Sequence, residues 1–268
     1  MARSVLITGC SSGIGRKTAV LFADKGWNVY ASSRNPEDIE DLEGIAEETL
    51  ELDVTDQDEV DRAVETVREN EGGVDSLVNN AGIGIMGAVE DVTTEELEKQ
   101  MEVNLYGPHR MIRAVLPGMR ERGKGRIINM SSISGRVSTP GMGAYVASKH
   151  ALEGLTDALR TEVQEFGIDA VLIEPGPVKT KFTDNADMEF DLDGPYGKLY
   201  RSMEDTTEEM FENKFSVTPD KIAKTVVKAA EARNPKARYT GAVQFRALRS
   251  AEHLPAKVQD WMYGKMMD

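Results

Sequence analysis

The chain opens with a short apolar run that leads directly into a glycine-rich loop and then an amphipathic helix. The run covers residues 4–8, and the loop reads Thr8-Gly9-Cys10-Ser11-Ser12-Gly13-Ile14-Gly15. Glycine permits a tight turn here and lets backbone N–H groups approach a pyrophosphate, which the partial positive charge of a helix N-terminus attracts. The order of strand, loop and helix predicts an α/β unit that binds a dinucleotide.

Short apolar segments alternate with amphipathic segments along most of the chain. We predict strands at residues 4–8, 27–31, 50–53, 76–79, 126–130 and 170–173, and helices at 14–25, 57–70, 95–120, 143–166 and 219–232. This alternation predicts right-handed βαβ units and a parallel sheet covered by helices on both faces. The apolar stripe of the helix at 143–166 could pack on the sheet or on a second subunit.

The alternation stops between Phe182 and Ser216, where aromatic and methionine side chains are interleaved with acids. A long irregular segment in a compact domain is usually functional, which predicts a substrate-pocket lid at about 182–217. A helix pair that packs on the body explains the same pattern. We expect the tail at about 241–268 to cover the substrate cleft rather than touch a membrane, and residues 1–268 to form a single domain.

Charge and cysteine content exclude several classes of function. A formal net charge of −14 is unsuited to general binding of nucleic acid or anionic membranes, and it fits either an ordinary solvated surface or a high-salt habitat. The single cysteine cannot form an intramolecular disulfide, and the three dispersed histidines offer no metal-ligand spacing. No apolar run reaches the roughly 18 residues that cross a bilayer, so we expect a cytoplasmic protein without a bound metal.

The end of the second predicted strand indicates which dinucleotide is bound. Dinucleotide folds hold the ribose 2′-hydroxyl of NAD with an acid about 20 residues after the glycine loop. Here Ser33 takes that place, and Arg34 follows it. A guanidinium pairs with a 2′-phosphate, which a carboxylate would repel. The pattern predicts NADP(H) rather than NAD(H), although Arg34 could also be a solvated loop charge.

Other polar residues follow the predicted strands at their carboxyl ends, where ligands bind in open α/β sheets. Asp53 and Val54 are placed to meet an adenine. Asn80, Ala81 and Gly82 end the fourth strand, and an asparagine amide there can hold the neighbouring loop.

The turn after the sixth strand is rigid and could meet a carboxamide. It contains Pro175, Gly176, Val178 and Thr180.

Tyr145 and Lys149 lie four positions apart in the helix predicted at 143–166, so both side chains lie on one helical face. A lysine ammonium stabilises a nearby phenolate, which predicts a tyrosine pKa below its usual value of about 10 and a phenol that serves as acid or base. Ser131 and Ser132 end the fifth strand, where a hydroxyl could bond to a substrate carbonyl oxygen. Each feature alone also arises by chance.

Asn104 lies four residues before Pro108 in the helix predicted at 95–120. Proline has no backbone N–H, so the Asn104 carbonyl loses its intrahelical partner and can accept a hydrogen bond from water. We expect this water to link the active site to solvent. A plain proline kink is the alternative interpretation.

The order and spacing of these motifs resemble the short-chain dehydrogenase/reductase superfamily over about residues 3–180. The resemblance implies a single Rossmann-type doubly wound α/β domain with a seven-stranded parallel sheet. It implies four catalytic residues, and Ser132 is favoured over Ser131 because the family serine usually lies thirteen positions before the tyrosine. The catalytic set is Asn104, Ser132, Tyr145 and Lys149. The cofactor-binding set is Gly9, Ser11, Ser12, Gly13, Ile14, Gly15, Ser33, Arg34, Asp53, Val54, Asn80, Ala81, Gly82, Tyr145, Lys149, Pro175, Gly176, Val178 and Thr180.

Residues 6–15, 138–145, 173–177 and 182–185 are similar to the hydroxysteroid/retinol dehydrogenase-like branch, which includes bacterial NADP-dependent aldehyde reductases. This resemblance implies hydride transfer between NADP(H) and a carbonyl or alcohol, in a homodimer or homotetramer. The segment after Thr180 favours a lipophilic substrate such as an aldehyde, ketosteroid, retinoid or long-chain ketone. The alternatives are an NAD-dependent alcohol dehydrogenase of the same fold, a non-catalytic NAD(P) sensor and a scaffold.

Overall fold

A seven-stranded parallel sheet forms the centre of the computed structural model, which describes residues 2–178, 190–212, 217–241 and 254–266. The strand order is β3-β2-β1-β4-β5-β6-β7, and it reverses direction between β1 and β4. The strands are β1 (Ser4–Ile7), β2 (Asn28–Ser33), β3 (Glu48–Glu51), β4 (Ser76–Asn79), β5 (Gly125–Met130), β6 (Ile168–Glu174) and β7 (Arg238–Thr240). This is the doubly wound α/β arrangement, so the predicted fold class is confirmed.

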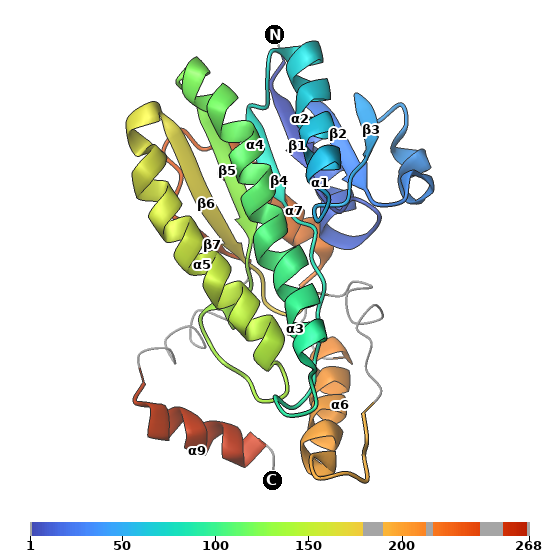
Figure 1. The fold of residues 1–268 in the computed structure, drawn as a ribbon, viewed down its shortest axis with the longest axis vertical. Coiled ribbons are helices and arrows are strands. Elements are labelled where there is room, and N and C mark those ends of the chain that lie inside the picture. Colours follow the sequence, from blue (N-terminus) through green and yellow to red (C-terminus); the bar gives the residue numbers. More distant parts are fainter. Residues whose placement is uncertain (1, 179–189, 213–216, 242–253, 267–268) are drawn as a thin grey trace.

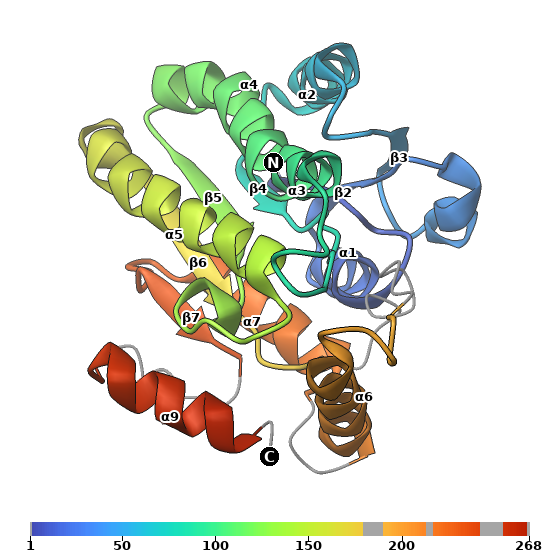
Figure 2. The ribbon, with the colours of Figure 1, turned by 60° about the horizontal axis from the view of Figure 1, so that its bottom comes forward.

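Helices cover both faces of the sheet (Figure 1). One face carries α1 (Gly13–Asp24) and α7 (Pro219–Glu231), and the other carries α2 (Gln57–Glu71), α4 (Gly107–Arg122) and α5 (Gly143–Val163). The shorter α3 (Thr94–Met101) precedes α4. Figure 2 shows α6 (Gly197–Glu212) and α9 (Ala256–Met266) at one end of the molecule, beyond the carboxyl ends of the strands.

Two apolar clusters fill the spaces between the sheet and its helices. Val5 and Ile7 of β1 face the α1–α7 side, where Phe22 is fully buried, and Leu6 faces the α2–α4 side with Leu77. Successive side chains of a strand point to opposite faces, so a strand buried on both faces needs an uninterrupted apolar run. This explains why β1 shows no polar alternation in the sequence.

The predicted elements differ from the structure in several places. The third strand lies at Glu48–Glu51 rather than at 50–53, and the long helix predicted at 95–120 is interrupted by a π-helix at Glu102–Tyr106. The three-residue strand β7 has too little apolar sequence for its pattern to reveal it. The described part of the segment predicted to be an irregular lid contains the regular helix α6.

The sheet-facing side of α5 is rotated from the centre of its predicted apolar stripe. Leu152, Leu159 and Val163 are buried on the sheet as expected, whereas Ala147 and Ala158 are exposed. The buried side therefore includes polar residues that the stripe left out, and a line of small residues faces outward.

In the described ranges, no helix has the length and apolar composition needed to cross a bilayer. Nor do these ranges contain a group of three or more His, Cys, Asp or Glu side chains arranged to hold a metal ion.

We expect Leu77→Ala to reduce the free energy of unfolding by about 2–5 kcal/mol, because Leu77 is fully buried in the central strand β4 and its loss leaves a cavity. Ile45→Ala is the control, since Ile45 is 45 % exposed and should change stability by less than about 1 kcal/mol. Urea denaturation followed by circular dichroism measures both. Equal effects would contradict the packing described for this face of the sheet.

Candidate active site

The glycine loop is held at the point where the strand order reverses. The Asn80 side-chain amide donates to the carbonyl oxygens of Thr8 and Gly9, at 2.9 Å each. The Thr8 hydroxyl in turn accepts hydrogen bonds from the backbone N–H groups of Asn80 and Ala81, at 3.0 Å each. The loops after β1 and β4 therefore form one unit at the carboxyl edge of the sheet, where open α/β sheets bind nucleotides.

The N-terminus of α1 is open to an anion. Its N-cap residue Ser12 makes no capping hydrogen bond through its side chain, and the first turn contains no acid. Gly9 and Gly13 both have positive φ, at 73° and 56°, which shapes the loop around this terminus. A Cβ on Gly15 would lie inside van der Waals contact of the Gly9 carbonyl oxygen and 2.5 Å from Asn80 Nδ2. A helix N-terminus without a side-chain cap suits an anion, and a pyrophosphate at this loop stays a prediction.

Arg34 lies at the end of β2 with an exposed side chain, directly after the buried Ser33. Its guanidinium has no hydrogen bond or ion pair with any other part of the described chain, unlike Arg16 in the first turn of α1. Arg16 donates to the Ser11 carbonyl at 3.1 Å and pairs with Asp41. Arg16 therefore braces the loop from outside, while Arg34 is available to an incoming phosphate.

The remaining predicted cofactor residues lie along the same edge. The carboxylate of Asp53 is engaged by Thr55, whose backbone N–H and hydroxyl donate to it at 2.9 and 2.8 Å, and Val54 is buried. The carbonyl of Pro175 accepts from the Ile133 N–H at 3.0 Å, which ties the turn after β6 to the turn after β5. Gly176 and Val178 follow in that turn, whereas Thr180 lies outside the described residues.

Asn104 lies in the π-helix and is 1 % exposed. Its side-chain oxygen accepts from the Ile83 N–H at 2.9 Å, and its Nδ2 donates to the Ile83 carbonyl at 3.0 Å and to Ser148 Oγ at 3.2 Å. The side chain therefore joins α5 to the loop after β4. Because Pro108 lacks an N–H, the wider helical turn here takes the place of a plain kink, and such π-bulges are frequent at functional sites.

Tyr145 and Ser132 meet at the N-terminal end of α5. Both residues are 9 % exposed, and the Ser132 hydroxyl lies close enough to the Tyr145 phenol to lower its pKa against the effect of burial. Ser132 also caps the short turn after β5 by accepting from the Ser134 N–H at 3.1 Å. Ser131, by contrast, has a buried hydroxyl that bonds to no other described residue. The structure therefore brings Ser132, rather than Ser131, to the tyrosine.

Lys149 lies one turn further along α5, with its ammonium 5.6 Å from the centroid of the Tyr145 ring. The ammonium donates to the Met130 carbonyl at 2.9 Å. Burial lowers the pKa of Lys149 to about 8 and raises the pKa of Tyr145 to about 12, and the hydrogen bond with Ser132 partly offsets the second shift. The expected lowering of the tyrosine pKa by the lysine is thus wrong for this geometry, because burial disfavours both charged forms.

Sequence reasoning missed several residues that hold these side chains. Ser148 donates to the Tyr145 carbonyl at 2.7 Å while it accepts from Asn104, so it couples α5 to the π-helix. Gln100 is fully buried and bonds to the backbone of Ile83 and Ile85. The available signal was a polar residue on the apolar, sheet-facing side of a helix, because a buried polar side chain needs a hydrogen-bond partner.

Helix α6 is attached to the loop after β4 at the open end of this site. The Tyr196 hydroxyl donates to Glu90 at 2.6 Å, and the Tyr200 hydroxyl bonds to Asp91. The Ala88 N–H donates to the same Tyr200 oxygen at 3.1 Å. Tyr200 is 2 % exposed, so this contact is a packed interface rather than a loose cover.

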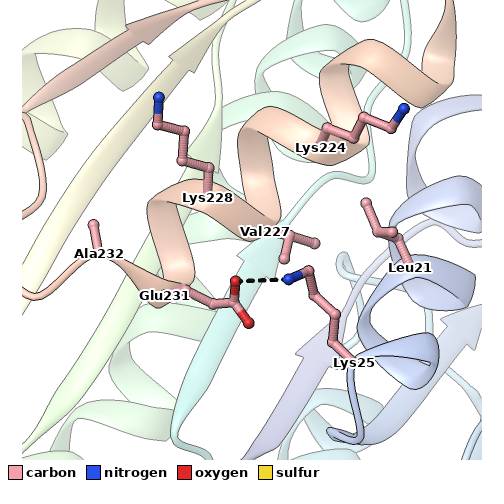
Figure 3. Close-up of a pocket in the computed structure, with 7 residues that line it drawn as sticks. All are labelled: Leu21, Lys25, Lys224, Val227, Lys228, Glu231 and Ala232. Carbon is pink, nitrogen blue, oxygen red and sulfur yellow. Dashed lines mark hydrogen bonds and ion pairs between the residues drawn. The ribbon is translucent and has the colours of Figure 1, made fainter.

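A separate groove lies between α1 and α7, and its lining is shown in Figure 3. The ion pair between Lys25 and Glu231, at 3.1 Å, closes one side of it. Lys25 directly follows the carboxyl end of α1, and Glu231 is the last residue of α7. The ion pair therefore lies at the end of α1 opposite the glycine loop. This groove therefore has no part in the site described above.

The sequence model of the family described as short chain dehydrogenase matches residues 3–189. The chain is 36 % identical to the uncharacterized oxidoreductase YbbO of Escherichia coli, over 97 % of this chain and 93 % of that protein. It is 34 % identical to an NADPH-dependent 3-dehydrocapnine reductase of Ornithobacterium rhinotracheale, over 98 % and 96 %. It is also 34 % identical to human retinol dehydrogenase 5, over 96 % and 86 %.

Solved structures with the same fold resemble this chain over most of its length. A short-chain dehydrogenase from Streptomyces avermitilis has a TM-score of 0.82 and 31 % identity, with 98 % of this chain and 97 % of that chain covered. The structure of ElxO with NADP bound has a TM-score of 0.74 and 28 % identity, with 90 % and 95 % covered. Another neighbour at 26 % identity, with a TM-score of 0.74 and 90 % and 97 % covered, contains NADH.

We expect Gly15→Ala to weaken binding of a nicotinamide dinucleotide by at least about tenfold, because the added Cβ displaces the Gly9 carbonyl and the Asn80 amide that shape the loop. Gly154→Ala is the control, since a Cβ there meets no atom within 4 Å and the helical backbone of α5 accepts alanine. Fluorescence titration with the reduced cofactor measures both. Unchanged affinity in Gly15→Ala would remove the glycine loop from the cofactor site.

Proposed function

The chain belongs to the short-chain dehydrogenase/reductase family, and we propose that it transfers a hydride between NADP(H) and a lipophilic carbonyl or alcohol. The observation that carries this proposal is the buried cluster at the carboxyl edge of the sheet. There the Ser132 side chain acts on the Tyr145 phenol and lowers its pKa against the effect of burial, and the Lys149 ammonium lies 5.6 Å from the tyrosine ring. A non-catalytic sensor or a scaffold would have no use for such a set.

In this mechanism Ser132 and Tyr145 bind the substrate oxygen together. The bound nicotinamide supplies or accepts the hydride at the carbon that carries this oxygen. Ser132 donates a hydrogen bond that stabilises negative charge developing on the oxygen, and Tyr145 delivers the proton in reduction. A phenol with a raised pKa is protonated at neutral pH, so it is ready to act as an acid. Lys149 stabilises the phenol oxygen as the proton leaves and bonds to the nicotinamide ribose.

Asn104 holds the water through which the proton of Tyr145 is replaced from solvent. Its side chain is engaged with Ile83 and Ser148, so the water would bind its backbone carbonyl, for which Pro108, four residues on, cannot provide the usual α-helical N–H.

The preference for NADP(H) rests on Arg34. Arg34 is exposed and unpaired within the described chain, and Ser33 takes the place where an acid would repel a 2′-phosphate. The NADPH-dependent relative and the NADP complex of ElxO support the same assignment. An NAD-dependent alcohol dehydrogenase remains the alternative, because another neighbour contains NADH.

The lipophilic substrate class rests on aromatic side chains in and just before α6. Tyr200 and Phe190 stack there with ring centroids 4.4 Å apart, beside the loop after β4. We propose that residues 182–217 act as the substrate-pocket lid and that the tail at 241–268 covers the substrate cleft, within one catalytic domain of residues 1–268. The similarity to retinol dehydrogenase 5 favours aldehydes, retinoids, ketosteroids and long-chain ketones as the substrates to screen for NADPH oxidation.

We also propose a homodimer or homotetramer assembled through α5. Its outward line contains the exposed Ala147 and Ala158, and small side chains allow two helices to approach closely across a two-fold axis.

Tyr145→Phe should lower turnover with the best substrate of the screen by at least about a hundredfold, because the proton donor is lost. The affinity for NADPH should change little, since the ring and its packing remain. Tyr106→Phe is the control, because Tyr106 is 48 % exposed. Steady-state rates and fluorescence titration measure the two quantities, and near-normal turnover in Tyr145→Phe would refute the mechanism.

Arg34→Ala should weaken NADPH binding by about tenfold or more, equal to about 1.4 kcal/mol, and leave NADH binding nearly unchanged. The reason is that the guanidinium meets only the 2′-phosphate. Lys25→Ala removes a cation at the far end of α1 and serves as the control. The NAD-dependent alternative would be favoured if the affinities for both cofactors fell equally, or if neither affinity changed.

A further inference from the structure

A buried carboxylate lies on α5 one turn beyond Lys149. Glu153 is 3 % exposed, and it continues the row that Tyr145 and Lys149 begin at a spacing of four residues. Residues four apart lie on the same helical face. A glutamate this deeply buried is costly unless its charge is compensated, so its presence in this row needs a reason.

Arg238 of β7 compensates most of this charge. Its guanidinium lies 2.9 Å from Glu153, 2.7 Å from Asp157 and 3.2 Å from Glu174. Arg238 therefore connects the edge strand β7 with α5 and β6 and fixes the position of the Glu153 side chain. Arg136, at the end of the turn after β5, lies 3.9 Å from the same Glu153 oxygen.

The second carboxylate oxygen of Glu153 is not used by this network. Both ion pairs and the hydrogen bond from Arg238 involve Oε2, and Oε1 bonds to no other described residue. The packing around it is tight, because a Cβ on Gly135 would lie 3.0 Å from Glu153 Cγ and 3.2 Å from the Lys149 carbonyl oxygen. One oxygen of the carboxylate thus has no partner among the described residues, and the glutamate packs close to the Lys149 backbone.

Lys149 needs a negative charge nearby. Its ammonium is 6 % exposed, and among the described residues it donates only to the neutral Met130 carbonyl. Burial lowers the pKa of Lys149 to about 8, and the negative charge of Glu153 acts against this shift. Several charged groups stand on the elements packed around the lysine. They are Glu153 and Asp157 on α5, Arg136 after β5, Glu174 on β6 and Arg238 on β7.

We propose that Glu153, fixed by Arg238, is a positioning residue that keeps the Lys149 ammonium charged at the Met130 carbonyl and beneath Tyr145. It touches neither cofactor nor substrate and acts through the lysine. The role of Lys149 in turnover rests on the proposed function, whereas the effect of Glu153 on its charge does not. Because Arg238 belongs to the edge strand, the same network also couples the packing of β7 to the catalytic end of α5.

The direct test is the titration of Lys149 in protein labelled with ¹³C at lysine Cε, whose chemical shift follows protonation. Loss of the signal in Lys149→Arg assigns it. Glu153→Gln removes a negative charge near an ammonium whose pKa is already low, so the titration midpoint should fall by at least about 0.5 pH units. Asp157→Asn, which loses a carboxylate bound to the same Arg238 one turn further away, should leave the midpoint within about 0.2 units.

Two further measurements separate positioning from structural support. Glu153→Asp keeps the negative charge, so the titration midpoint of Lys149 should stay near its wild-type value. If Glu153 had a purely structural role, Glu153→Gln would lower stability without moving this midpoint. Arg238→Gln should raise the midpoint, because Glu153 is then uncompensated, and this opposite sign decides the matter if Glu153→Gln does not fold. An unchanged midpoint in Glu153→Gln, or a fall in Arg238→Gln, would overturn the proposal.

Activity gives a second reading. In Glu153→Gln the ratio of kcat/KM at pH 9 to that at pH 6.5 should fall by about threefold, because the lysine loses its proton at lower pH, while NADPH affinity at pH 6.5 stays unchanged. The lysine titration needs no turnover. An inactive wild-type chain would therefore count against the proposed function, and the titration would still decide the role of Glu153.

Discussion

The hydrogen bonds between Asn80 and the carbonyls of Thr8 and Gly9 are the junction on which the site depends. They lie where the strand order reverses between β1 and β4, so they join the two halves of the sheet at its carboxyl edge. Gly15 must lack a side chain for this junction to close. The N-terminus of α1 and the N-terminal part of α5, which carries Tyr145 and Lys149, lie at this same edge of the sheet.

Burial governs the ionisation of two side chains at this edge. Tyr145 and Lys149 are both shielded from water, which shifts each toward its neutral form, although a pKa of about 8 still leaves Lys149 charged at neutral pH. This explains why proximity of the two side chains does not by itself produce an acidic tyrosine. It also makes each remaining charge more effective, because the surroundings screen it weakly. Glu153 and Arg238 therefore matter because they are charged and buried near these side chains, which their positions in the sequence do not reveal.

Much of the fold was predictable because its signals are local. A strand buried on both faces must be apolar throughout, and a glycine loop between strand and helix has few other uses. The limits of prediction were equally local. The edge strand β7 has three residues, which is too short to show an alternating apolar pattern. The π-helix at Asn104 depends on a change of helix register, and the nearby proline does not by itself specify that change. The buried side of α5 is rotated from its predicted apolar stripe because polar side chains of this helix find buried partners.

The sequence by itself determined the class of fold, the order of the motifs and the identity of the residues that meet at the carboxyl edge, since each depends on spacing along one element. Only the tertiary structure decided that the Ser131 hydroxyl is left without a partner among the described residues, and that Arg238 reaches Glu153 at a separation of 85 positions in the sequence. Such contacts depend on which strands are neighbours and which way a side chain leaves the sheet. The same holds for the pKa of a buried group, which reflects everything packed around it.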